Sequence, residues 1–100
     1  MGPDEMMFFL SIVPDEVLVK IASEEATLYA QSVQSGDDAA IAADTLLTQM
    51  IHANLIWRDL DADALDLFNR VNALAPNGGI LQNLTYSDYV DFVRESDPSN

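Results

Sequence analysis

Three aspartates that alternate along the chain are the first residues whose spacing could serve chemistry. Asp59, Asp61 and Asp63 match the first, third and fifth places of a calcium-binding loop. That loop also requires glycine at its sixth place and a bidentate glutamate at its twelfth, where this chain has Ala64 and Arg70. Helix capping and a solvent-facing surface explain the run better, so no calcium site is predicted.

The single histidine, His52, is the other candidate for catalysis or metal binding. Catalysis would require a nucleophile or an acid positioned against it, and a metal ion would require further ligands. The nearest acids at helical spacing, Asp44 and Asp59, lie eight and seven residues away, too far for direct contact along one helix. We therefore interpret His52 as a partly buried, hydrogen-bonded imidazole.

The remaining motifs do not indicate a cofactor. The neighbouring acids at 15–16, 24–25 and 37–38 point to different helix faces, which argues against a shared acid–base site. The glycines at 78–79 lack the spacing and the lysine of a phosphate-binding loop, and the sequon at 83–85 is a chance match unless the protein is secreted. Without cysteine, thiolate metal sites and disulfides are excluded. The sequence predicts no catalytic residue, cofactor or metal, and no enzyme.

The charge balance narrows the class of partner. Seventeen acids face four bases (Lys20, Arg58, Arg70 and Arg94), which gives a formal net charge of −13. Nucleic acid and anionic membranes require a basic footprint, so neither is an expected partner. A basic protein surface would be attracted. The alternative explanation for the charge is solubility, or a high-salt cytoplasm.

Aromatic and methionine side chains are the better functional signal. Core packing accounts for most of them, because large aromatics dominate protein interiors. Interfaces are also enriched in these residue types, and the cluster at 6–9 is compact and adaptable. The predicted protein-interface residues are Met6, Met7, Phe8, Phe9, Met50, Trp57, Tyr86 and Tyr89.

The element that must position these residues is a helix predicted over 37–57. It has no interior glycine or proline and is apolar on nearly every side, so the rest of the chain has to cover it. We expect Leu47 to be fully buried on its core-facing side. The residues assigned to that face are Ala43, Leu46, Leu47, Met50, Ile51, Ala53 and Trp57.

Three more helices are predicted. The first runs from about 14 to 34 and ends at Ser35-Gly36, after which Asp37 or Ser35 caps the central helix. The next starts with Asp61 as its N-cap and stops before a turn at 75–79, while 80–84 stays unassigned. The last starts at Thr85, whose spacing to Asp88 is that of a capping box, and ends near Asp97.

The segment 6–13 has seven apolar residues among eight and is either a short helix or an extended arm. Acids precede it where a secretory signal has bases, so we expect no signal peptide and a cytoplasmic protein. The central helix is about as long as a membrane span, but it contains Asp44, Gln49, His52 and Asn54, so no membrane span is predicted. The predicted fold is a single all-α domain over 1–100, a small bundle of about four helices with an apolar N-terminal arm at 1–13 and a frayed tail at 97–100.

The expected function is non-enzymatic. A regulatory protein that binds another protein with a basic surface and masks it, as an inhibitor or an anti-activator, fits the absence of a catalytic constellation and the apolar excess. A homodimer through the central helix or the arm would bury part of that excess. The alternatives are an acidic nucleic-acid mimic that blocks a DNA-binding protein, and a structural subunit of a larger assembly.

Overall fold

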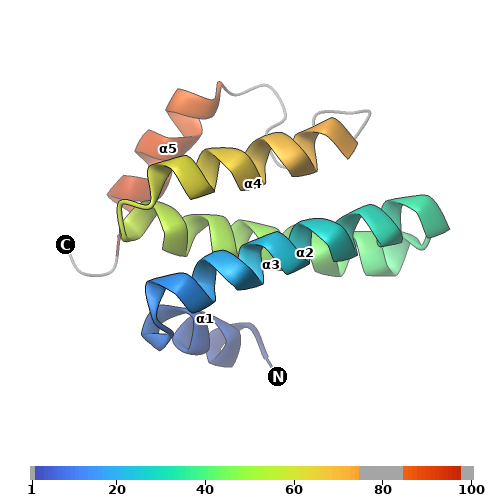
Figure 1. Cartoon of the computed structure of the whole chain (residues 1–100), viewed down its shortest axis with the longest axis horizontal. Helices are drawn as coiled ribbons and strands as arrows, with labels where there is room; N and C mark the ends of the chain where they lie inside the picture. Colours follow the sequence, from blue (N-terminus) through green and yellow to red (C-terminus); the bar gives the residue numbers. More distant parts are fainter. Residues whose placement is uncertain (1, 75–84, 98–100) are drawn as a thin grey trace.

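The computed structural model describes residues 2–74 and 85–97, and all regular structure in these residues is helical (Figure 1). The prediction of an all-α fold is confirmed. Five helices are present in this part of the chain, one more than predicted, because the N-terminal arm is itself a helix. They are α1 (Pro3–Ile12), α2 (Asp15–Ser35), α3 (Asp38–Trp57), α4 (Asp61–Leu74) and α5 (Tyr86–Glu95).

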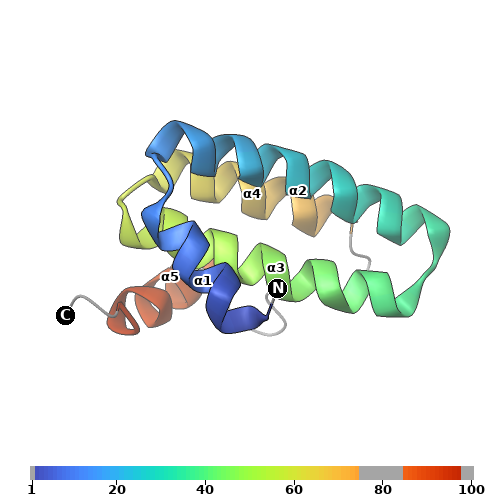
Figure 2. The same cartoon turned by 90° about the horizontal axis from the view of Figure 1, so that it is seen from below.

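The connection between α2 and α3 follows the sequence prediction. Gly36 adopts a left-handed conformation (φ 69°), and its N–H donates to the carbonyls of Ser32 and Val33. The Asp37 carboxylate then caps α3 by accepting from the N–H groups of Ala39 and Ala40, at 3.1 and 3.2 Å. So short a link makes α2 and α3 antiparallel neighbours, as Figure 2 shows.

The start of α4 differs from the prediction. The Ala64 N–H donates to the Leu60 carbonyl at 3.0 Å, so Leu60 holds the N-cap position and Asp61 is the first helical residue. Asp61 is therefore not the cap. Its carboxylate is used elsewhere, since Asp61 Oδ1 accepts from Arg94 Nη2 on α5 at 2.9 Å.

The start of α5 follows the prediction. The Thr85 side chain accepts from the Asp88 N–H at 3.1 Å, an N-cap that contributes about 1 kcal/mol to stability in typical proteins. The helix ends at Glu95, before Asp97. The predicted turn at 75–79, the unassigned segment 80–84 and the end of the tail lie outside the described residues.

The predicted core face of α3 is partly right: Ile51 is completely buried, and Leu47, Met50, Ala53 and Trp57 are partly buried against the core. Its buried stripe follows Thr48, Ile51, His52 and Leu55, an ideal three- and four-residue spacing that includes two polar residues. Leu46 is 48% exposed, and Leu47 is only partly buried. Because α3 is apolar on nearly every side, hydrophobicity alone did not single out the side that faces the core.

The arrangement of the other helices explains which part of α3 is buried. Both α2 and α4 pack along it, α5 lies against its C-terminal half, and α1 also packs against it (Figures 1 and 2). No residue of α3 before Thr48 is buried in this structure. The buried hydrophobic residues are Leu10, Leu18, Ala22, Ala26, Tyr29, Ile51, Leu55, Ile56, Ala64, Leu67, Val71 and Val93.

Candidate protein-interaction surface

Among the described residues, helix α1 is held to the molecule through its inner side. Pro3 and two acids occupy its first turn, which suits the start of a helix, and Leu10 is completely buried on its inner side. The Arg58 guanidinium donates to the carbonyls of Leu10 and Val13 and forms an ion pair with Asp15 at 3.0 Å. Arg58 thus satisfies carbonyls at the end of α1 and links this helix to α3.

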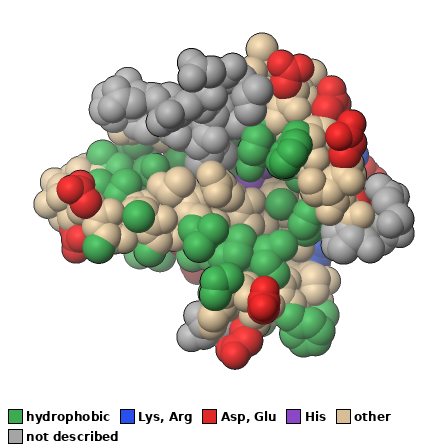
Figure 3. Space-filling model, turned by 180° about the vertical axis from the view of Figure 1, so that it is seen from behind, with side chains coloured by type: hydrophobic (Ala, Val, Ile, Leu, Met, Phe, Trp, Pro, Cys, Tyr) green, Lys and Arg blue, Asp and Glu red, His purple; other side chains and the backbone are tan. Residues whose placement is uncertain are grey.

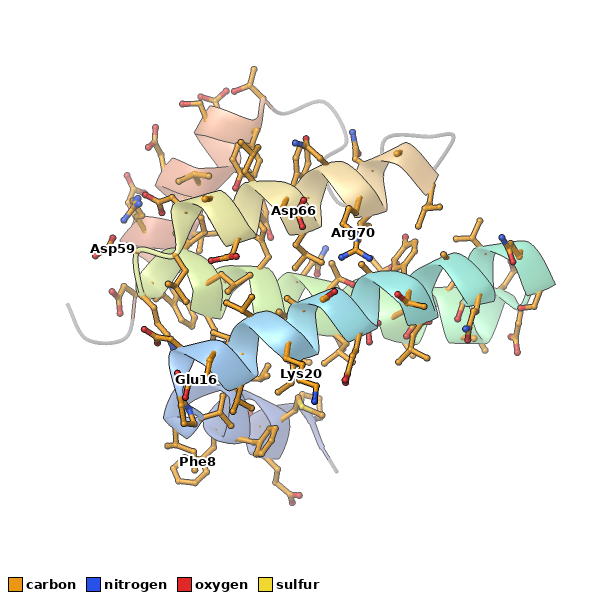
Figure 4. The ribbon with its side chains drawn as sticks, viewed as in Figure 1. Phe8, Glu16, Lys20, Asp59, Asp66 and Arg70 are labelled. Atoms are coloured by element: carbon orange, nitrogen blue, oxygen red, sulfur yellow. The ribbon has the colours of Figure 1, made fainter. Side chains whose placement is uncertain are left out.

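The other side of α1 exposes large apolar side chains. Phe8 is 66% exposed and Ile12 is 62% exposed, and their four-residue spacing makes them neighbours on the helix surface. Phe9, beside them, is 40% exposed. We call Phe8, Phe9 and Ile12 the α1 outer face. Together with Asp4 and Glu5 they line an open hollow of 490 Å³, and Figure 4 shows Phe8 directed away from the helical body.

A second apolar surface lies where α1 meets α3. We call it the α1–α3 groove; its volume is 260 Å³, and none of the described residues that line it is charged. Figure 3 shows apolar side chains gathered in the middle of the molecular face that carries α3. The lining residues are Gly2, Pro3, Met6, Ala43, Leu46, Leu47 and Met50.

The predicted interface residues therefore divide into groups. Met6 and Met50 line the α1–α3 groove, and Phe8 and Phe9 belong to the α1 outer face. Met7 is partly buried, and its sulfur accepts a weak hydrogen bond from Asn54 Nδ2 at 3.9 Å. Met6, Met50, Phe8 and Phe9 thus line the two apolar surfaces, and Met7 lies in neither of them.

Trp57 is used within the fold. Its Nε1 donates to the Val93 carbonyl at 2.7 Å, which ties the end of α3 to α5. The ring is partly buried against the core. This contact gives Trp57 a structural role, and a role at an interface stays a prediction.

His52 and two tyrosines form an aromatic cluster between α3 and α5. His52 is completely buried, its Nε2 lies 3.1 Å from the Tyr86 hydroxyl, and its ring centroid lies 5.3 Å from that of Tyr89. The predicted hydrogen-bonded imidazole is confirmed, but burial is complete rather than partial. Burial lowers the pKa of His52 to about 4 and raises the pKa of both tyrosines. At neutral pH the cluster is uncharged, so it is suited to packing rather than to proton transfer.

Sequence reasoning missed a buried carboxyl group. Glu25 is 2% exposed, and its Oε1 has no hydrogen-bond partner among the described residues. Burial raises the pKa of Glu25 to about 8, and hydrogen bonding to Asp44 and the negative charge of Asp44 add to this shift. The sequence did contain a signal, because Glu25 lies on the apolar stripe of Leu18, Ala22 and Tyr29. The influence of Asp44, which lies on the next helix, could not be read from neighbouring acids on one helix.

The calcium-like run is engaged in ion pairs. Asp59 Oδ1 and Asp61 Oδ1 accept from the two terminal nitrogens of Arg94, at 3.0 and 2.9 Å. Across 2–74 and 85–97, no three His, Asp or Glu side chains gather in a way that could hold a metal ion. In the same residues, no helix has both the length and the hydropathy required to cross a membrane.

Comparison of this chain with protein-family models, with curated proteins and with solved structures gives no match. The functional argument therefore rests on the exposure, charge and contacts of the chain itself.

Proposed function

We propose that this protein is a non-enzymatic, cytoplasmic regulator that binds another protein and masks its surface, as an inhibitor or an anti-activator. A transcription regulator is one such target. The observation that carries the proposal is the α1 outer face, where Phe8 and Ile12 are 66% and 62% exposed on a helix already anchored through its opposite side.

Helix α1 is anchored from the side opposite this surface. Leu10 and Arg58 hold α1 in place from its inner side, so the outer side chains contribute little to packing. An exposed apolar cluster edged by polar residues is typical of a binding site, and phenylalanine is enriched at interfaces. Single exposed apolar residues occur on many surfaces without a role. The α1 outer face differs because three such side chains are adjacent.

Two alternatives use the acids or the whole fold instead. An acidic nucleic-acid mimic needs carboxylates spaced like phosphates, whereas the acids here gather at helix starts and connections. Asp37 caps α3, and Asp15 and Asp59 pair with arginines. These contacts support structural uses for the acids, so the mimic ranks below the masking protein. A subunit of a larger assembly is the other alternative.

Affinity capture from a native lysate with matched variants tests the proposal. Phe8→Ser/Ile12→Ser removes the α1 outer face, and Phe92→Ser removes a phenylalanine of nearly equal exposure, 65%, from α5. We expect one protein to be retained by the wild type and by Phe92→Ser, and lost with the double variant. Equal retention by all three would reject the α1 outer face as the binding surface.

The identity of the retained protein separates the functions. A transcription regulator or an enzyme whose activity falls on binding supports the masking role. A nuclease or another DNA-binding protein held through its nucleic-acid groove would favour the mimic, and structural subunits would favour the assembly component.

A further inference from the structure

We infer, as a refinement that rests on the proposed function, that the α1 outer face binds a cationic amphipathic helix of its partner protein. The apolar side of that helix would cover Phe8 and Ile12, and its lysines or arginines would lie against Asp4 and Glu5.

The shape of the surface favours a helix as the occupant. Side chains four residues apart form ridges on a helix, and such ridges pack into the grooves of another helix. On α1 one ridge runs through Asp4, Phe8 and Ile12, and the next runs through Glu5 and Phe9. Both ridges carry their acid at the N-terminal end of α1 and their apolar residues toward the C-terminal end. A complementary helix therefore has an apolar patch with cations at one end of it.

The charge favours a basic partner over a second copy. Residues 1–19 contain four acids and no base, and Lys20 is the first cation of the chain. Asp15 is already paired with Arg58, whereas Asp4 and Glu5 line the hollow with the exposed phenylalanines. In Figure 4, Glu16 lies at the same corner of the molecule as Phe8.

The same acids disfavour the other occupants. A second copy has no basic side chain within residues 1–19 to pair with these acids, so it would leave them without a cationic partner. An anionic membrane surface is repelled by these acids. The remaining occupant that satisfies both the apolar ridges and their acidic ends is a cationic helix of another protein.

The test uses designed peptides as probes. One is an amphipathic helix of about 18 residues, long enough to form a helix, with leucines on one side and lysines beside them. A second replaces every lysine with glutamine. Titration calorimetry with the full-length protein should show that the lysine peptide binds about three- to tenfold more tightly than the glutamine peptide, as expected for two exposed charge pairs.

Matched charge variants locate the preference. Asp4→Asn/Glu5→Gln should abolish the advantage of the lysine peptide, whereas Asp88→Asn/Asp91→Asn, which changes the net charge equally on α5, should retain it. Equal losses in both double variants would mean that only the overall charge of −13 attracts the peptide, and would overturn the inference.

The apolar variants separate this inference from the proposed function. Loss of binding by both peptides in Phe8→Ser/Ile12→Ser, with helicity retained in circular dichroism, supports the α1 outer face as the site. Phe8→Ala alone serves if the double variant unfolds. If both peptides bind the α1 outer face with equal affinity, the inference of a cationic partner is rejected, while the proposal that this face is a binding surface is retained. If neither peptide depends on Phe8, or if zwitterionic vesicles bind through it more tightly than the peptides, the proposed function fails as well.

Discussion

The outer face of α1 and the C-terminal half of α3 reverse the usual arrangement of side chains. On α1, Phe8 and Ile12 face solvent; in α3, Thr48 and His52 are completely buried. The difference lies in what covers each helix, since α3 is enclosed by the other helices near its end and α1 is covered on one side only. Residue type alone therefore does not decide position in a small bundle. The way in which the helices pack against one another decides which face of each helix is buried.

The polar side chains of the interior are only partly satisfied. His52 Nε2 has the Tyr86 hydroxyl and Asn54 donates to the Met50 carbonyl at 2.8 Å, whereas within the described part of the chain His52 Nδ1 and Thr48 Oγ1 have no hydrogen-bond partner. A buried polar group without a partner lowers stability by about 1–3 kcal/mol. The packing around Leu55 and Ile51 has to offset that cost.

The largest expected change in stability comes from truncating a leucine in the buried half of α3, compared with a leucine in its exposed half. Leu55 is completely buried, and Leu55→Ala should lower the free energy of unfolding by about 2–5 kcal/mol. Leu46, on the same helix, is 48% exposed, and Leu46→Ala should change it by no more than about 0.5 kcal/mol. Leu47 is partly buried, so its truncation should fall between the two. Urea denaturation measures the free energy of unfolding of all three variants. Equal losses at positions 46 and 55 would contradict the difference in burial between the two halves of α3.

The pH dependence of stability tests the polar interior. Because its folded pKa is raised from 4.5 to about 8, Glu25 lowers stability as pH rises between these values, by about 1.4 kcal/mol per pH unit for one proton. His52 has its folded pKa lowered from 6.5 to about 4, so it raises stability with pH over that interval. The two opposing slopes overlap below pH 6.5. The decline from Glu25 alone should therefore emerge between about pH 6.5 and 8.

Two variants isolate this decline in melting experiments. Glu25→Gln should abolish it, because the amide does not titrate. Asp44→Asn should move it to lower pH, because the Asp44 charge contributes to the raised pKa of Glu25. A wild-type stability that stays level from pH 6.5 to 8 would contradict the buried, protonated Glu25.

Self-association is a smaller effect, and we propose that it uses the α1–α3 groove. The radius of gyration, 12.9 Å, is close to the value of about 13 Å for a compact chain of this length. Because a single chain is already compact, a second copy should add little to its stability. The described residues that line the groove are uncharged, which lets two chains of charge −13 approach there, and salt should tighten the dimer. Sedimentation equilibrium across a salt series measures it. Leu46→Glu should weaken the dimer and Leu65→Glu, at a similarly exposed position on α4, should not; a monomer under every condition would reject it.

The elements were predictable because their signals are local. Gly36 and Asp37 fix the α2–α3 connection, and Thr85 starts α5 through bonds to its own neighbours in the chain. The prediction that Asp61 is the N-cap of α4 was wrong by a single residue, because Asp61 is the first residue inside the helix and forms an ion pair with Arg94 on α5 instead. Local chemistry locates a helix end to within a residue.

The burial of particular faces was not predictable because it depends on distant segments. The apolar stripe chosen for α3 was as regular as the true one, and the positions of the helices packed around α3 distinguish them. Glu25 could have been noticed from its place on the stripe of α2, but its partner Asp44 comes from the next helix. Of the predicted interface, Phe8 and Phe9 are exposed, whereas Trp57 is tied to α5.

The central claim is that the α1 outer face is surplus to folding and available for a partner. The free energy of unfolding of Phe8→Ser/Ile12→Ser, compared with that of the wild type in urea denaturation, tests it most directly. Surface substitutions away from packed contacts change stability by no more than about 0.5 kcal/mol each, so the double variant should remain within about 1 kcal/mol of the wild type. A loss of 2 kcal/mol or more, roughly the cost of emptying a core position, would show that these side chains belong to the packed interior and would contradict the account.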